Sequence, residues 1–307
     1  MRPRTLSVAL ALWGALAAGA APSQAAAPRI AFDASTGTGG DTPTNVFTTA
    51  PSGAGPFQVT HDPAPATSQS PDWSPKQKRI VFVSDRTGAT KLWTIKADGT
   101  GLKKLTKGDL LDDAPAWSPG GDLIAFDRPG HVHAGEDFFD IFTIRRDGTH
   151  LRRVTHWKPE TTAPDWSPGG DRLTFQRADD WGPPQIWTMG VDATRPRQLT
   201  SMVNGAGPPA WSPNGKLIAF ASHSGNASQI FVVPAGGGTE RQVTHDPPGT
   251  FDADPTWSPT SKRIVFSTTH SPPGGANIAS IAVDGTGRHQ VIGDPTGETA
   301  YRSPSWG

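Results

Sequence analysis

Histidine and carboxylate side chains carry the candidate chemistry of this 307-residue chain, which contains no cysteine. Disulfides and thiol catalysis are therefore excluded. The tightest cluster joins His131 and His133 to Glu136 and Asp137. In an extended segment, residues two apart face the same side, and imidazole with carboxylate is a suitable ligand set for zinc, manganese or similar ions. The competing interpretation is a solvated polar loop over residues 127–139.

A second candidate set would bind a ligand rather than a metal. We expect Asp113 and Asp254, with Asp252 beside them, to precede inner strands of a repeated element described below and to face the mouth of its central channel. Trp157 and Trp181 lie outside that element. Carboxylates and indoles are common recognition groups. For the aspartates, the alternative is a turn acceptor that caps backbone N–H groups.

Several function classes find no support in the sequence. No Gly-x-Ser-x-Gly element occurs, and the glycines of residues 37–40 are not followed by a helical pattern, so nucleophilic hydrolysis and phosphate binding are not indicated. The 28 basic and 28 acidic side chains give a formal net charge of zero without a basic stripe. We therefore expect no nucleic-acid partner.

The scaffold that must position these groups is a repeat. A Trp-Ser-Pro element recurs, and a sixth tryptophan ends the chain, at spacings of 44, 49, 45, 46 and 49 residues. The tryptophans are Trp73, Trp117, Trp166, Trp211, Trp257 and Trp306. The period suits a four-stranded propeller blade, and we expect these indoles to fill the space between neighbouring blades.

Short strand patterns complete each unit. An apolar triplet such as Ile80–Phe82 precedes a second β-rich run, an Asp-Gly turn and a closing Val-Thr pair. The last unit contains only the Trp306 strand, and residues 30–60 supply the missing strands. The sequence thus predicts an all-β, six-bladed β-propeller of four-stranded blades, whose ring closes by combining N- and C-terminal strands in one blade.

These motifs resemble the TolB-like, WD40-like (PD40) propeller repeat, with its Pro-x-Trp-Ser-Pro-x-Gly, Ile-Ala-Phe and Asp-Gly signatures, over residues 26–307. We expect no counterpart of the N-terminal α/β domain of TolB within residues 1–307. The resemblance implies a non-catalytic binding or scaffold propeller for a protein or envelope component. An alternative, implied by oligogalacturonate-lyase-like propellers, is a metal-dependent polysaccharide lyase or hydrolase with a site at the channel mouth. A third is a structural Ca²⁺-binding propeller.

The N-terminus indicates export. Arg2 and Arg4 precede an apolar stretch over residues 6–21, and Ser23-Gln24-Ala25 fits a small-residue cleavage site. We expect a secretory signal over residues 1–25 and a single propeller domain over residues 26–307. The mature protein is then a monomer in the periplasm or outside the cell, without a transmembrane segment.

Topology assigns the candidate residues to one side of the ring. In an antiparallel four-stranded blade, the loop between strands two and three shares a face with the link to the next blade. We call this the long-loop face, since these segments are long and irregular. Seven of the nine histidines fall there, and His61, His156 and His245 each follow a Val-Thr pair. Their repetition is explained by a turn cap or by a shared metal, although the outer strands hold them far apart.

Overall fold

The computed structural model describes residues 29–36, 42–133, 136–158, 160–178, 182–223, 225–269, 275–294 and 296–307. The predicted signal over residues 1–25 and Trp181 lie outside these ranges. The side chains of His131, His133, Glu136 and Asp137 also lie outside the description. Within the described ranges, no helix is long and apolar enough to cross a membrane.

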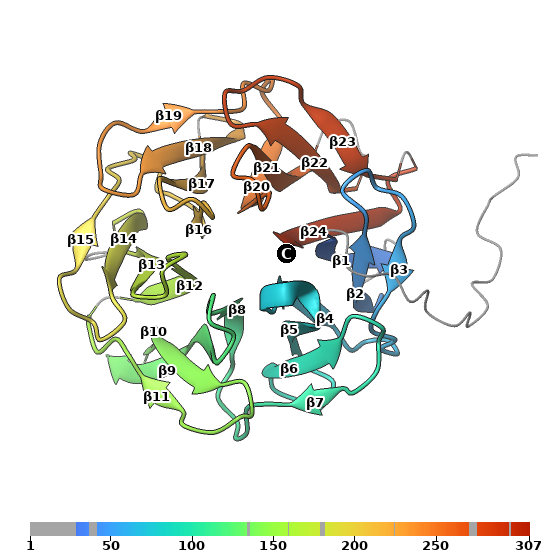
Figure 1. The fold of residues 1–307 in the computed structure, drawn as a ribbon, viewed down its shortest axis with the longest axis vertical. Helices are drawn as coiled ribbons and strands as arrows, with labels where there is room; N and C mark the ends of the chain where they lie inside the picture. Colours follow the sequence, from blue (N-terminus) through green and yellow to red (C-terminus); the bar gives the residue numbers. More distant parts are fainter. Residues whose placement is uncertain are drawn as a thin grey trace, which may run out of the picture.

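The protein is an all-β propeller of four-stranded blades, arranged around a common axis in Figure 1. Each blade runs antiparallel from an inner strand to an outer one. The first three blades along the chain have the following strands. They are β4 (Ser68–Trp73), β5 (Arg79–Ser84), β6 (Lys91–Lys96) and β7 (Lys103–Lys104); β8 (Asp113–Trp117), β9 (Leu123–His133), β10 (Glu136–Arg145) and β11 (Arg152–Arg153); and β12 (Thr161–Trp166), β13 (Arg172–Arg177), β14 (Gln185–Gly190) and β15 (Arg197–Gln198).

The next strands belong to one eight-stranded sheet. These are β16 (Ala210–Trp211), β17 (Leu217–His223), β18 (Ser228–Pro234) and β19 (Arg241–Gln242), then β20 (Phe251–Trp257), β21 (Arg263–Thr269), β22 (Asn277–Ala282) and β23 (His289–Ile292). The two antiparallel halves are joined by a parallel pairing of Ser228 in β18 with Phe251 in β20. A short 3-10 helix, η1 (Pro75–Gln77), follows β4.

Strands from opposite ends of the chain share one sheet, as the sequence predicts. This sheet has the order β24 (Thr299–Trp306), β1 (Ile30–Thr36), β2 (Thr44–Thr49) and β3 (Phe57–Gln58). Pairing between β1 and β24 runs from Ile30↔Trp306 to Thr36↔Thr299. The C-terminal strand therefore lies innermost, next to the centre of Figure 1.

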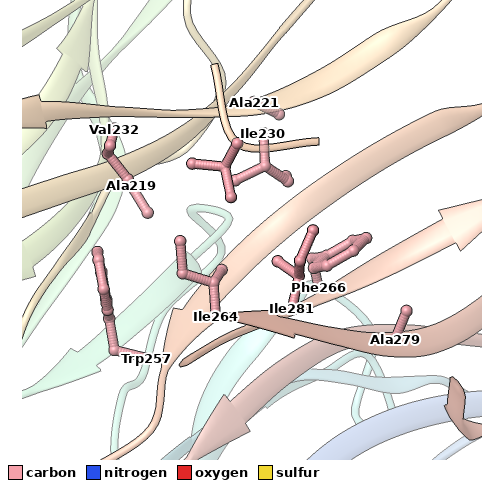
Figure 2. Packing of buried hydrophobic residues seen from close by; sticks show 10 residues of the cluster. Ala219, Ala221, Ile230, Val232, Trp257, Ile264, Phe266, Ala279 and Ile281 are labelled. Carbon is pink, nitrogen blue, oxygen red and sulfur yellow. The ribbon is translucent and has the colours of Figure 1, made fainter. Parts of the chain in front are cut away.

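Apolar residues of neighbouring blades pack together around each repeat tryptophan. Figure 2 shows one such cluster, in which Trp257 and Ile264 of one blade meet Ala219 and Ile230 of the preceding one. A second cluster places Trp73 against Ala31, Val46 and Val59. Trp73, Trp117, Trp166 and Trp257 are buried, and Trp211 and Trp306 are partly buried.

A bulge with an unusual backbone conformation recurs in the inner strands. The residue three positions before the repeat tryptophan has positive φ in five blades: Ser70, Ala114, Ala163, Asp254 and Ser303, at 45–52°. In β16 this position is Pro208. Proline fixes φ near −65° and has no N–H donor, so this conformation is excluded there. β16 accordingly spans two residues, whereas the other inner strands span 5–8.

The structure corrects two details of the sequence interpretation. The predicted loop over residues 127–139 is wrong, because β9 continues to His133 and β10 begins at Glu136. These strands pair from Arg145↔Leu123 to Glu136↔His133. Phe138, Phe139 and Ile141 favour a strand, which explains the long hairpin. Asp113, Asp252 and Asp254, expected before the inner strands, lie within β8 and β20.

Candidate functional site

Half-buried aspartates on the inner strands are used for blade-to-blade contacts. Asp72 and Asp165 precede repeat tryptophans, and each accepts a hydrogen bond of 2.6 Å from the backbone N–H of the next blade's tryptophan, Trp117 and Trp211. Burial raises the pKa of Asp72 to about 6 and that of Asp165 to about 7. Both carboxyls therefore have a structural partner.

In two blades, different groups make the equivalent contact. Ala116 and Ala210 occupy the position of these aspartates and have no side-chain acceptor. There, the indole Nε1 of the next tryptophan donates to the alanine carbonyl: Trp166 to Ala116 at 3.1 Å and Trp257 to Ala210 at 2.9 Å. The residue before each of these tryptophans thus decides whether the tryptophan of the next blade donates its backbone N–H or its indole N–H to it.

A second layer of carboxyls supports the inner-strand bulges. Asp33 accepts from the N–H of Ser70 at 3.2 Å, and Asp127 from the N–H of Ala163 at 2.8 Å. Burial raises the pKa of Asp33 to about 6, with a further contribution from Asp254. Burial, with nearby carboxylates, raises the pKa of Asp127 to about 7. The sequence signal for these two residues, an aspartate directly after the Ile-Ala-Phe triplet, was overlooked.

Asp113 and Asp254, the predicted ligand-binding aspartates, also have local partners. Asp113 is exposed and accepts from the N–H of Ala114 at 2.7 Å. Asp254 is half-buried and accepts from the hydroxyl of Ser267 at 3.1 Å. These contacts match the alternative of a turn or bulge acceptor.

Asp252 is different, because it is wholly buried and neither carboxylate oxygen has a hydrogen-bond partner of good geometry. Its oxygen Oδ2 lies 3.7 Å from Nη1 of Arg288. Burial raises its pKa to about 6, against a smaller opposite effect of the nearby Thr268 and Thr244 hydroxyls. The equivalent Asp112, also five residues before a repeat tryptophan, instead receives Arg128 at 2.5 and 3.0 Å.

The other predicted groups are placed apart from one another. Trp157 is half-buried, with its ring 5.9 Å from Phe175 and Cζ of Arg177 5.2 Å above it. His61, His156 and His245 are exposed. The capping role in the Val-Thr-His segments belongs to threonine: the hydroxyls of Thr60, Thr155 and Thr244 accept from Val46, Ile141 and Ile230 N–H groups at 2.8–2.9 Å.

Among the described side chains, no group of three or more histidines and carboxylates could hold a metal ion. The predicted cluster of His131, His133, Glu136 and Asp137 falls outside that set. The backbone register pairs Glu136 with His133 and Asp137 with Val132 across the hairpin. The metal site therefore stays a prediction.

A pocket of about 320 Å³ opens beside the short strand β16. We call it the interblade pocket, since its walls come from the segments before β16, from the end of β17 and from the start of β20. The lining residues are Gln176, Pro184, Asn204, Gly205, Ala206, Gly207, Pro208, Ala221, Ser222, His223, Ser228, Phe251, Asp252 and Ala253. Of these, the sequence interpretation named Asp252 as a binding residue.

Large apolar side chains flank this pocket in solvent. Val203 is 89% exposed and Phe251 is 40% exposed, and the ring of His223 meets Phe251 edge-on at 6.5 Å. By topology, both the Val203 link and the Phe251 link belong to the long-loop face. Exposed apolar groups around a pocket favour an interaction site.

Residues 113–307 match the PD40 family, the TolB beta propeller domain. The chain belongs to this family. An uncharacterized protein, Atu1656, of Agrobacterium fabrum is 34% identical over 73 residues, which are 24% of this chain and 23% of that protein. The Tol-Pal system protein TolB of Anaeromyxobacter dehalogenans strain 2CP-C is 40% identical over 45 residues, 15% of this chain and 10% of the relative. Both matches thus span a small part of the relatives' length.

Solved structures share the TolB-type fold with this chain. TolB from Acinetobacter baumannii superposes with a TM-score of 0.76 at 21% identity, covering 91% of this chain and 66% of that one. An oligogalacturonate lyase in complex with manganese superposes with a TM-score of 0.55 at 14% identity, covering 86% of this chain and 73% of the lyase. At these identities the likeness concerns the fold alone.

The interblade pocket is the part of this TolB-family propeller that the sequence interpretation missed. Its signal is Gly-Pro-Pro-Ala-Trp at residues 207–211, where Thr-Ala-Pro-Asp-Trp stands at residues 162–166. The additional proline, Pro208 at the position of Ala163, is visible in the sequence. Its effect on the neighbouring blade depends on the path of residues 245–252, which the repeat pattern does not specify.

Proposed function

We propose that this TolB-family propeller is a non-catalytic binding protein that holds a protein or envelope component on its long-loop face. The observation that supports this most is the interblade pocket, with partly exposed Phe251 in its lining and exposed Val203 next to the lining residue Asn204 in sequence. Leu110 and Leu111, in the link between β7 and β8, are also about half exposed on that face. A protein partner would bury these apolar groups.

The opposite face is formed by turns that satisfy their own polar groups. The carboxylate of Asp98 accepts from the N–H and hydroxyl of Thr100 at 2.9 and 2.7 Å. Asp147 and Thr149 repeat this pattern at 2.9 and 2.6 Å. Leu102 and Leu151 are exposed beside these turns. They provide matched controls for the long-loop face.

The proposal also covers the number of blades and the location of the protein. If the two halves of the eight-stranded sheet count as separate blades, the ring has six blades, with β24 and β1 closing it. The predicted signal and the likeness to Tol-Pal system proteins favour an exported monomer in the periplasm or outside the cell. N-terminal sequencing of the secreted protein tests cleavage after Ala25.

Affinity capture with matched variants tests the binding function. The mature protein, Val203→Asp and Leu151→Asp are immobilised at equal density and exposed to an envelope extract, and captured proteins are quantified. We expect one partner to be retained by the mature protein and by Leu151→Asp, and to fall about tenfold with Val203→Asp. Equal retention by all three, or selective loss with Leu151→Asp, would contradict the proposal.

The predicted metal cluster has a separate test. Metal analysis of the purified protein, with His131→Ala and Glu136→Ala as variants, measures whether an ion is bound in stoichiometric amount. Loss of a transition metal together with polysaccharide cleavage activity would favour the lyase or hydrolase alternative. Calcium-dependent melting would favour the structural alternative.

A further inference from the structure

Polar side chains in the walls of the interblade pocket already bond to the chain itself. Gln176 Nε2 donates to the carbonyl of Ala206 at 2.7 Å, and the Ser222 hydroxyl donates to that of Gly205 at 2.6 Å. Asn204 Nδ2 donates to the carbonyl of His223 at 3.0 Å. These bonds hold the residues 204–206 in place. The polar side chains of Gln176, Asn204 and Ser222 in this wall are therefore already hydrogen-bonded within the chain.

Among its described lining residues, the pocket has no Lys, Arg or Glu, and its one Asp is buried. Its titratable members are His223, on the rim, and Asp252. The Asp252 side chain is 0% exposed, so its carboxylate presents no surface to the cavity. An ion entering the pocket would lose its water without gaining a partner, whereas an apolar group would gain from burial.

Size and shape restrict the occupant further. A cavity of about 150 Å³ holds a benzene molecule, and this pocket measures about 320 Å³. Pro184, Pro208 and Phe251 supply rigid, flat walls, and Ala221 and Ala253 leave room between them. Flat apolar walls of this size suit one large aromatic side chain.

Phe251 in the lining is partly exposed, and Val203, next to the lining residue Asn204 in sequence, is also exposed. A free small molecule inside the pocket would leave Val203 in water, but a protein segment can cover it. We infer that the interblade pocket is the anchor site for a single aromatic side chain, tryptophan or phenylalanine, on the partner protein. This inference rests on the proposed function and adds the chemistry of the partner.

A titration with small probes tests the pocket without the partner. The mature protein, labelled at alanine methyl groups, is titrated with N-acetyl-tryptophanamide and, for comparison, with N-acetyl-argininamide. We expect the tryptophan probe to shift the methyl signals of Ala206, Ala221 and Ala253 and to saturate below about 10 mM. Ala253→Leu, which fills the pocket, and Phe251→Ala, which removes part of its wall, should each weaken this binding at least about fivefold. Leu151→Asp should not.

The outcomes separate this inference from the proposed function. Failure of the tryptophan probe to saturate, or equally tight binding of the arginine probe at the same methyls, overturns the aromatic anchor. If the partner is still captured and is lost with Val203→Asp, the proposed function survives that failure. Unchanged partner capture by a folded Ala253→Leu variant would also overturn the anchor, and thermal melting and the methyl spectrum verify that this variant is folded.

Discussion

The blades that begin with β12 and β16 contain the same repeat and differ in their inner strand. In β12, Ala163 has φ of 49° and donates its N–H to Asp127, and the strand pairs with β13 from Thr161 to Trp166. In β16, Pro208 takes this place; β16 pairs with β17 at Ala210 and Trp211, and Gly207 before it donates its N–H to the carbonyl of Ala221 at 2.7 Å. A change within the repeat thus removes part of a strand and leaves a pocket on the long-loop face.

The neighbouring blade contributes the start of β20 to the lining of the pocket. Phe251, at the start of β20, pairs with Ser228 of β18, and the Ser228 hydroxyl donates to the carbonyl of Asp252 at 2.8 Å. This crossing joins two blades into one sheet. The comparison shows that the pocket lies where the repeat is broken, while the repeated residues serve packing.

The largest expected effect concerns the packing shared by both blades. Trp166→Ala should lower the free energy of unfolding by about 3–5 kcal/mol, because a buried indole and its bond to Ala116 are lost. Trp157→Ala, which changes a half-buried indole outside the repeat, should cost less. Chemical denaturation measures both variants. A negligible change for Trp166→Ala would contradict the stabilising role of this tryptophan between neighbouring blades.

Exchanging the residues at the compared position tests the role of the bulge. Ala163→Pro should destabilise the protein by about 3 kcal/mol or more, since it removes an N–H bonded to a buried carboxylate and forbids positive φ. Pro208→Ala should change stability by less than about 1 kcal/mol. Thermal melting of the pair gives the comparison. Similar effects of the two substitutions would show that Pro208 does not explain the short strand.

A smaller effect is expected in the pH dependence of stability. The folded pKa of Asp165, about 7, lies above its usual value of 3.8 because of burial. Protonation therefore favours the folded state, so this contribution is complete below about pH 4 and is lost as pH rises through about 7. Asp165→Asn keeps an acceptor for Trp211 and should flatten the fall in stability between these pH values.

Asp98→Asn provides the control for this pH experiment. Asp98 is on an exposed turn, and its hydrogen bonds with Thr100 lower its pKa. Its titration therefore lies below the window in which Asp165 titrates, and the substitution should leave the slope between pH 5 and 7, roughly, as in the parent protein. Denaturant titrations at several pH values measure the slope. An unchanged slope in Asp165→Asn would contradict the buried-carboxyl assignment.

Much of the fold could be predicted because the repeat is local and regular. The spacing of Trp73 through Trp306 and the Asp-Gly turns specify blades, and the incomplete last unit specifies the pairing of β24 with β1. The path of the links could not be predicted, since it depends on contacts between blades. The hairpin through His133 and Glu136 was missed because a run with Gly and two His resembles a loop, although its Phe and Ile residues favour strand.

The candidate site was predicted only in part, for a related reason. The long-loop face followed from antiparallel topology, and Asp113 and Asp254 have hydrogen-bond partners within their own blades, in Ala114 and Ser267. The pocket lies where Pro208 excludes the positive-φ bulge found in the other inner strands. A search for motifs detects residues that are present, and it does not detect a conformation that is missing. Comparing each unit with the repeat average, position by position, would have indicated β16.

Hydrogen–deuterium exchange with and without the captured partner tests the central claim most directly. The account predicts that the partner slows exchange in residues 201–209 and 247–254, which border the interblade pocket, and leaves the turns at residues 98–102 and 147–151 unchanged. Protection confined to those turns, with the pocket segments exchanging as in the free protein, would place the binding surface on the opposite face and contradict the account.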